Sequence, residues 1–104
     1  MPSTSLRREF KFSILVPAAD YYPQAGAEEQ VLLQGVVDCC FETLEGITVV
    51  DFKTDRVDRR SVAARAEEYR PQLAAYSRAL EEITGKPVIR RCLWFFALDQ
   101  AVDV

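Results

Sequence analysis

The chain has 104 residues, of which 49% are hydrophobic and 28% are charged, a composition typical of one small globular domain spanning residues 1–104. It contains no apolar run near the roughly 20 residues that a membrane helix needs, and its start lacks the apolar stretch of a signal peptide, so we expect a cytoplasmic protein without a membrane segment. The net charge of −3 argues against a domain that coats nucleic acid by bulk electrostatics, but metal-binding carboxylates contribute to that charge, so a metal-dependent enzyme is not excluded.

The first predicted element is a half-buried strand over Glu9–Val16, where apolar and polar side chains alternate. Its apolar face comprises Phe10, Phe12, Ile14 and Val16. The segment Pro17–Glu29 is rich in Pro, Gly, Ala and acidic residues, which predicts a loop between two strands.

The second and third predicted strands form a hairpin. Gln30–Glu42 is apolar enough to be buried on both faces for much of its length, and Thr43–Gly46 supplies a turn. Ile47–Thr54 then returns antiparallel to the second strand.

One main helix follows the polar loop Asp55–Ser61, with Ser61 as its expected N-cap. The helix has an apolar stripe with spacings of four and three residues, made by Tyr69, Leu73, Tyr76, Leu80 and Ile83. It is expected to end near Thr84, before Gly85. Pro71 lies inside the pattern, where a proline costs roughly 3 kcal/mol. We therefore expect a kink, or two helical pieces of which the second begins with Pro71 in its first turn.

The last predicted strand is Val88–Phe96, again with alternating side chains. Strand, helix and strand from residue 47 to residue 96 make a crossover unit, so this strand should lie parallel to the third, with a right-handed connection. The fold class is therefore α/β (α+β), with three antiparallel strands, one parallel strand and one main helix on a face of the mixed sheet.

Three cysteines, Cys39, Cys40 and Cys92, occur in predicted strands. The side chains of Cys39 and Cys40 point to opposite faces of a strand and cannot bind one metal together. We expect buried, reduced thiols. Three cysteines also cannot complete the four-cysteine ligation of an iron–sulfur cluster within this chain.

The candidate chemistry lies in Asp38, near the end of the second strand, and in Asp51 and Lys53 on the third. Asp51 and Lys53 share a strand face at a separation of roughly 7 Å, which suits two groups beside one phosphate. If the hairpin register places Asp38 on the same face, two carboxylates would meet, and a divalent cation such as Mg²⁺ would relieve their repulsion. This set predicts phosphodiester hydrolysis. The alternative is that Asp51 and Lys53 form an exposed ion pair, worth under about 1 kcal/mol.

Three segments, Gln34–Asp38, Val49–Asp55 and Gln72–Tyr76, resemble the GxxD, D-x-K and QxxxY motifs of the RecB-like branch of PD-(D/E)XK nucleases. The flanking segments Tyr69–Leu73 and Ala79–Val88 look closest to the C-terminal nuclease domains of AddA-type helicase–nuclease proteins from bacterial AddAB enzymes. The likeness covers roughly residues 8–96.

The resemblance implies a role for each matching residue. Asp38 and Asp51 would bind Mg²⁺, with Mn²⁺ as an alternative, and the main-chain carbonyl of Phe52 would be a further ligand. Lys53 would be the catalytic lysine. Gln72 and Tyr76, one helical turn apart, would support the DNA backbone or the ligand geometry.

Rival interpretations remain for the supporting residues. Tyr76 also belongs to the apolar stripe, and Gln72 could be an exposed helix residue. Several arginines could steer DNA phosphates, although a solvated charged face explains most of them: Arg56, Arg59, Arg60, Arg65 and Arg70.

The chain departs from the family in one respect. The family core is αβββαβ, and its first helix normally supplies an acidic residue and often a histidine to the metal site. This sequence has no histidine and starts almost at the first strand, so we expect a restriction-endonuclease-like βββαβ part that lacks the first helix and is a fragment of a larger protein.

Two functional hypotheses follow. The first is a Mg²⁺-dependent deoxyribonuclease (exonuclease) domain of a helicase–nuclease in double-strand break repair and recombination, weakly active or inactive alone. Its partners would be DNA, the helicase domain of the parent chain and an AddB-like subunit. The second is a non-catalytic module of the same fold that contacts DNA or docks a partner subunit.

Overall fold

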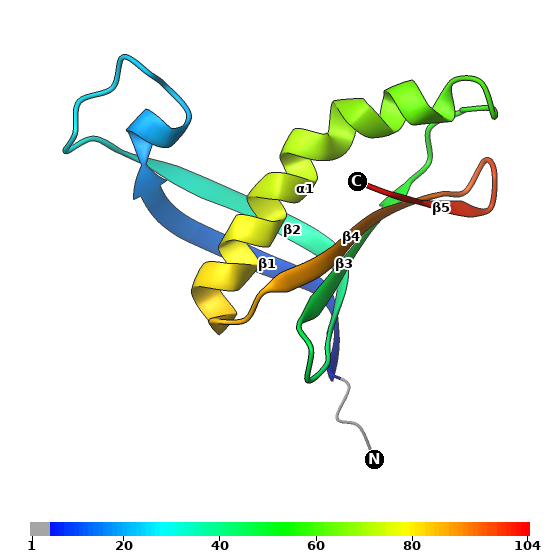
Figure 1. Cartoon of the computed structure of the whole chain (residues 1–104), viewed down its shortest axis with the longest axis horizontal. Helices are drawn as coiled ribbons and strands as arrows, with labels where there is room; N and C mark the ends of the chain where they lie inside the picture. Colours follow the sequence, from blue (N-terminus) through cyan, green and yellow to red (C-terminus); the bar gives the residue numbers. More distant parts are fainter. Residues whose placement is uncertain (1–4) are drawn as a thin grey trace.

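The computed structural model describes residues 5–104, which form one five-stranded sheet and one long helix (Figure 1). The elements are β1 (Ser5–Pro17), the 3-10 helix η1 (Ala18–Asp20), β2 (Gln30–Glu42), β3 (Ile47–Lys53), α1 (Val62–Thr84), β4 (Val88–Phe95) and β5 (Gln100–Asp103). The strand order in the sheet follows the sequence, and β3 and β4 are the parallel pair. The mixed sheet with one long helix is the predicted fold class.

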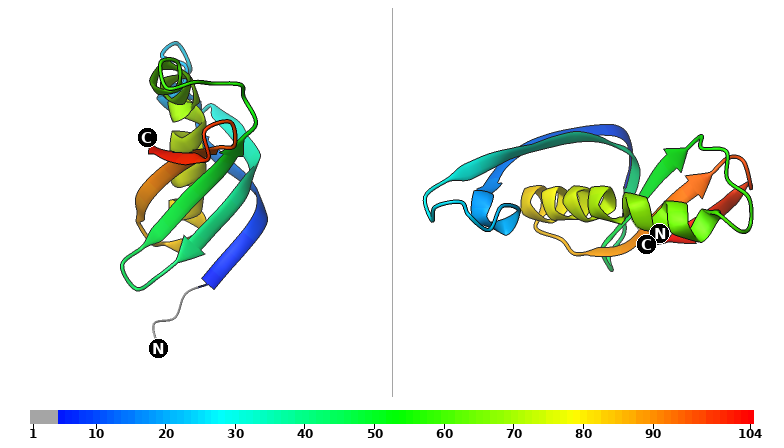
Figure 2. Two further views of the ribbon diagram at one scale, coloured as in Figure 1. Left: turned by 90° about the vertical axis from the view of Figure 1, so that its right-hand side faces the viewer. Right: turned by 90° about the horizontal axis from the view of Figure 1, so that it is seen from above.

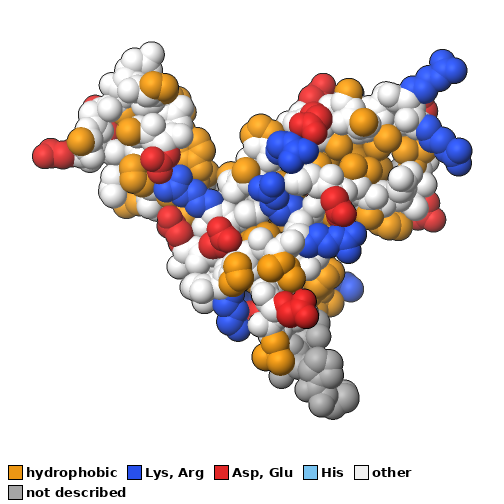
Figure 3. All heavy atoms as spheres, in the orientation of Figure 1, with side chains coloured by type: hydrophobic (Ala, Val, Ile, Leu, Met, Phe, Trp, Pro, Cys, Tyr) orange, Lys and Arg blue, Asp and Glu red, His pale blue; other side chains and the backbone are white. Residues whose placement is uncertain are grey.

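The sheet divides into two arms. β1 and β2 pair from end to end except at Glu9 and Asp38, but β2 pairs with β3 only over Cys39–Glu42. The rest of β2 therefore runs with β1 as a two-stranded arm that leaves the sheet in the opposite direction from β3, β4 and β5 (Figure 2). In the space-filling view a notch separates the β1–β2 arm from the part of the molecule that contains α1 (Figure 3). The strands that carry Asp38 and Asp51, β2 and β3, thus diverge near Asp38.

The core lies between α1 and the facing side of the sheet. On the helix, Leu73 and Leu80 are fully buried, and they pack with Val37, Val49 and Phe95 of the strands. Burial of such side chains contributes about 1.5–3 kcal/mol each. This packing holds α1 against β2, β3 and β4, and it therefore determines which helix residues face β3.

The predicted burial of β2 on both faces is wrong for its first half. There the burial alternates, and Leu32 and Val36 are 51% and 40% exposed, because no described residue covers the outer face of the arm. In β1 the predicted apolar face is confirmed, with Phe12 and Val16 buried. Opposite Asp38, Glu9 interrupts β1 with a positive φ of 52°.

The helix is one continuous element, so of the two alternatives expected at Pro71, a kink or a division into two helical pieces, the division is wrong. Pro71 is exposed within it. The predicted end is confirmed, since Gly85 closes the helix with φ 74° and donates its N–H to the Glu81 carbonyl oxygen at 2.9 Å. No helix among residues 5–104 is long and apolar enough to cross a bilayer.

The start of α1 differs from the predicted capping. Ser61 is the N-cap residue but makes no side-chain capping bond. Instead, its hydroxyl accepts the N–H of Asp58 at 3.0 Å, and the Asp58 carboxylate accepts the N–H groups of Arg60 and Ser61, each at 2.9 Å. The loop itself, rather than the first turn of the helix, uses the Ser61 hydroxyl.

Two further features complete the fold. The sequence patterns did not predict β5, a short edge strand that follows a turn in which Asp99 has φ 50°. The three cysteines are buried free thiols, as predicted. At the β2–β3 turn, Gly46 has φ 150°, and a Cβ there would lie 2.6 Å from the Pro87 carbonyl oxygen.

Candidate active site at the fork between β2 and β3

The two predicted acids meet where β2 and β3 separate. The β2–β3 ladder ends with the pair Cys39 and Val50, so Asp38 and Asp51 occupy the next opposed positions and share a face. Asp38 Oδ2 accepts the main-chain N–H of Phe52 at 2.9 Å. Beyond the last backbone pair, the Asp38 side chain thus takes over the contact between β2 and β3. The hairpin register places Asp38 on the same face as Asp51, as the predicted site requires.

Lys53 joins this pair to the helix. Its Nζ lies 2.6 Å from Asp51 Oδ2 and donates to Gln72 Oε1 at 2.8 Å. Gln72 Nε2 in turn donates to the Tyr76 hydroxyl oxygen at 3.0 Å. The Lys53 and Asp51 side chains are only 12% and 4% exposed, so the alternative of a solvent-facing ion pair is wrong.

The pKa of Asp51 is raised to about 6, chiefly because the carboxyl group is buried and also because it hydrogen-bonds Asp38, while Lys53 acts in the opposite direction. The pKa of Tyr76 is raised by burial and by the charges of Asp51 and Asp38. A buried carboxyl group that keeps its proton up to about pH 6 beside a second carboxyl is a place where a cation can take that proton's role.

Gly35 explains how the helix approaches so closely. A Cβ at Gly35 would lie 3.1 Å from the Phe12 ring and 3.2 Å from the Tyr76 ring. Phe12 and Tyr76 also make an edge contact, with ring centroids 5.7 Å apart. A side chain at position 35 would therefore push the Tyr76 ring away from β2, and with it the hydroxyl that Gln72 contacts.

The donor set fits a hard divalent cation in part. Asp38 and Asp51 offer carboxylate oxygens, the ligands that Mg²⁺ and Mn²⁺ prefer. Within residues 5–104 no group of three or more Asp, Glu, Cys or His side chains is placed to hold a metal ion. The remaining ligands would come from main-chain carbonyls, water or substrate, which agrees with the few protein ligands that Mg²⁺ usually takes.

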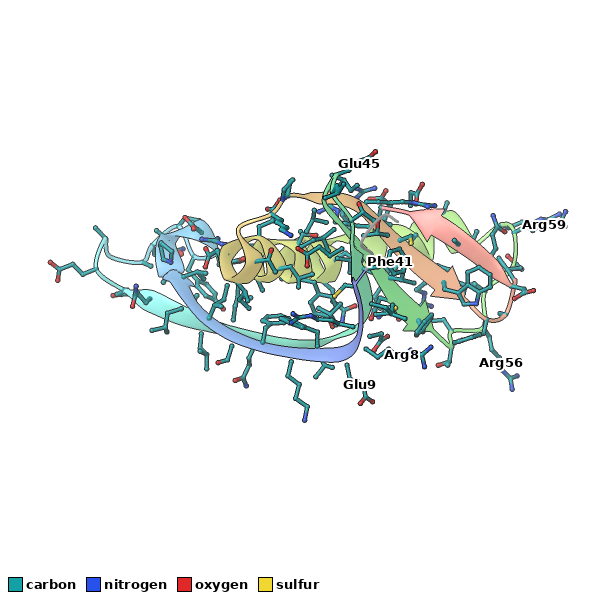
Figure 4. All side chains as sticks on the ribbon, turned by 90° about the horizontal axis from the view of Figure 1, so that it is seen from below. Arg8, Glu9, Phe41, Glu45, Arg56 and Arg59 are labelled. Atoms are coloured by element: carbon teal, nitrogen blue, oxygen red, sulfur yellow. The ribbon has the colours of Figure 1, made fainter. Side chains whose placement is uncertain are left out.

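The arginines lie mostly outside this cluster. Arg56 and Arg59 project outward from the β3–α1 loop (Figure 4). Arg65 lies 3.4 Å from Asp55, and Arg70 lies 2.7 Å from Glu67 in an exposed pair.

Two residues next to Lys53 were not predicted as part of the site. The Lys53 ammonium lies 3.9 Å from the ring centroid of Tyr69, and the Tyr69 hydroxyl donates to the Asp55 carboxylate at 2.8 Å. The available signals were the spacings: Asp55 follows Lys53 by two residues, and Tyr69 precedes Gln72 by three.

Comparison with known proteins gives one family and many relatives. Residues 3–102 match the sequence profile of the PD-(D/E)XK nuclease superfamily. The chain is 43% identical over 91 residues to an ATP-dependent helicase/nuclease subunit of Desulforudis audaxviator, covering 86% of this chain and 7% of that protein. It is 41% identical over 100 residues to the protein of the same name from Listeria welshimeri, covering 90% and 8%. It is 38% identical over 108 residues to that of Ruminiclostridium cellulolyticum, covering 100% and 9%. The chain thus spans less than a tenth of these relatives.

Proposed function

Because this chain belongs to the PD-(D/E)XK nuclease superfamily, we propose that it is the catalytic part of a Mg²⁺-dependent deoxyribonuclease. The observation that supports this best is the convergence of Asp38, Asp51 and Lys53 at the fork, with Gln72 reaching Lys53 from the helix. Asp38 and Asp51 would hold the cation, with the Phe52 carbonyl as a further ligand.

The reaction is hydrolysis of a phosphodiester bond. A divalent cation bound there would supply a water of lowered pKa and would neutralise charge on the phosphate. Lys53 positions the attacking water or holds a phosphate oxygen, which stabilises the charge that develops in the transition state. Asp51, whose pKa is raised to about 6, would have to be deprotonated to serve as a ligand, so the affinity for a cation is expected to rise as pH increases through about 6.

The helix residues orient Lys53. The Gln72 carbonyl oxygen takes one N–H of the ammonium, and the Tyr76 hydroxyl fixes the other end of the Gln72 amide. Lys53 is therefore held from two sides, by Asp51 on its own strand and by Gln72 on α1. This restraint lowers the entropic cost of placing the amine against a phosphate.

The parent protein is proposed to be a helicase–nuclease that acts in DNA double-strand break repair and recombination in the cytoplasm. Support comes from the relatives named as ATP-dependent helicase/nuclease subunits, of which this chain matches a short part. Its partners would be DNA, the helicase domain of the same polypeptide and an AddB-like subunit. The isolated chain is expected to be weakly active or inactive.

The metal site is tested by thermal unfolding of this chain with Mn²⁺ or Mg²⁺ against EDTA. The cation should raise the melting temperature of the wild type and leave Asp38→Ala and Asp51→Asn unchanged, since a ligand at 100 times its Kd stabilises by about 2.7 kcal/mol. Asp103→Asn, an exposed carboxylate on β5, is the matched control and should respond as the wild type does. Equal responses of all four proteins would reject the site.

The role of Lys53 is tested in the full-length parent. Lys53→Ala should abolish DNA cleavage while ATP hydrolysis and unwinding continue, and wild-type cleavage by this variant would reject the role. Salt-sensitive DNA binding without cleavage in the wild-type parent would instead favour a non-catalytic module. One observation favours that alternative: residues 5–104 contain no group of three or more Asp, Glu, Cys or His side chains placed to hold a metal ion.

A further inference from the structure

Tyr69 packs its ring against the amine of Lys53. The Nζ atom lies 3.9 Å from the ring centroid, well within the range of a cation–π contact. Tyr69 precedes Gln72 by three residues on α1, so both side chains project from neighbouring positions of the same helix face. The helix therefore contacts Lys53 twice, once through the Gln72 amide at 2.8 Å and once through an aromatic face.

The far end of the Tyr69 ring is also held. Its hydroxyl donates to both carboxylate oxygens of Asp55, at 3.0 and 2.8 Å. Arg65 Nη1 lies 3.4 Å from Asp55 Oδ2 and helps to balance its charge. Asp55 is two residues beyond Lys53 in the chain, so the strand that carries the amine leads directly to the group that fixes the ring.

The choice of an aromatic partner has a chemical consequence. The Lys53 ammonium has three N–H groups, of which Asp51 and Gln72 engage two. A third polar partner would occupy the last N–H group, whereas a ring face attracts the positive charge without a strong acceptor. The third N–H therefore remains available to a phosphate oxygen or to water.

We propose that Tyr69 and Asp55 are positioning residues for Lys53: the Tyr69 ring restrains the ammonium, and Asp55 fixes the ring through its hydroxyl. The reaction that Lys53 serves rests on the proposed nuclease function, but the restraint itself belongs to this chain. Lysine side chains are flexible and lose considerable rotamer freedom when fixed. Removal of the Tyr69 ring should therefore increase the mobility of the Lys53 amine and leave the affinity for DNA unchanged.

The restraint can be measured by NMR of the isolated chain without any catalysis. A ring face over the amine shifts the Lys53 ε protons upfield, and this shift should be present in the wild type and in Tyr69→Phe but lost in Tyr69→Leu. Tyr22→Leu, at an exposed tyrosine of the β1–β2 loop, should leave the shift unchanged. An unchanged shift in Tyr69→Leu, or no upfield shift in the wild type, would overturn the restraint. If Tyr69→Leu fails to fold, an upfield shift that is present in both the wild type and Tyr69→Phe still supports the restraint, and no upfield shift in the wild type still overturns it.

The catalytic consequence is measured in the full-length parent. Tyr69→Leu should lower kcat roughly tenfold with an unchanged KM for DNA. Tyr69→Phe and Asp55→Asn should each give a smaller loss, and the double variant should lose no more than either alone. A rise in KM with unchanged kcat, or additive losses, would overturn the positioning role. Full cleavage by Lys53→Ala would reject the proposed function instead, and would leave the NMR result standing.

Discussion

Replacement of Asp51 by asparagine should stabilise this chain at neutral pH when divalent cations are absent. The folded-state pKa of Asp51 is about 6 against an ordinary value of 3.8. The folded chain therefore binds more protons than the unfolded chain between these values, and the contribution of Asp51 to stability falls as pH rises through that window. About two pKa units at about 1.4 kcal/mol each correspond to a cost of up to about 3 kcal/mol above pH 6.

Asparagine imitates the protonated acid. Its amide can donate to Asp38 as the shared proton does, and its carbonyl oxygen can still accept from Lys53. The difference in the free energy of unfolding between variant and wild type should then be near zero at pH values below about 4, grow between pH 4 and 6, and stay constant above pH 6.

Urea denaturation in EDTA at a series of pH values measures this difference, with Asp103→Asn as the control for removal of an exposed carboxylate. A difference independent of pH, or a variant less stable than the wild type at pH 8, would refute the reasoning about burial and the shared proton. Addition of Mn²⁺ should shrink this difference at pH 8, because only the wild type gains the cation.

Two glycine substitutions test the close approaches of the backbone. Gly35→Ala should cost about 1–2 kcal/mol and displace Tyr76, seen by denaturation and by loss of the contact to its ring, because the new methyl group lies 3.2 Å from that ring; an unchanged stability and ring environment would contradict this. Gly46→Ala should cost more than about 2 kcal/mol, since it combines a positive φ with a contact of 2.6 Å to the Pro87 carbonyl oxygen. Gly85→Ala, with positive φ but open space, is its control at about 1 kcal/mol, and equal losses would show that crowding at Gly46 is unimportant.

Much of the fold was predictable because the strands and the helix follow from the spacing of apolar residues within short segments. Alternation along the strands and the crossover rule give the sheet and the parallel pair. The missed strand β5 has four residues, too few for a pattern to stand out. Pro71 did not divide α1 because it is exposed, so the Glu67 carbonyl that loses its helical donor can turn toward water.

The sequence predicted those site residues that belong to the recognised motifs. Asp51 and Lys53 share a face in any strand, but the position of Asp38 depended on a hairpin register that sequence alone does not fix. Tyr69 was assigned to the apolar stripe because periodicity does not distinguish a ring that packs on a core from one that packs on an amine. The roles of these residues in metal binding and catalysis stay predictions.

The interruption of β1 at Glu9 bears on how readily the edge of the sheet could pair with a second chain. β1 lies at the edge of the sheet and is 13 residues long, and an exposed edge of that length can template pairing with a second chain. The positive φ of Glu9 breaks the regular line of backbone donors and acceptors, and the exposed charges of Arg7, Arg8 and Lys11 flank the break. An incoming strand would meet a bent ladder and like charges, so the longest open edge in the described part of the chain is also poorly suited to self-association.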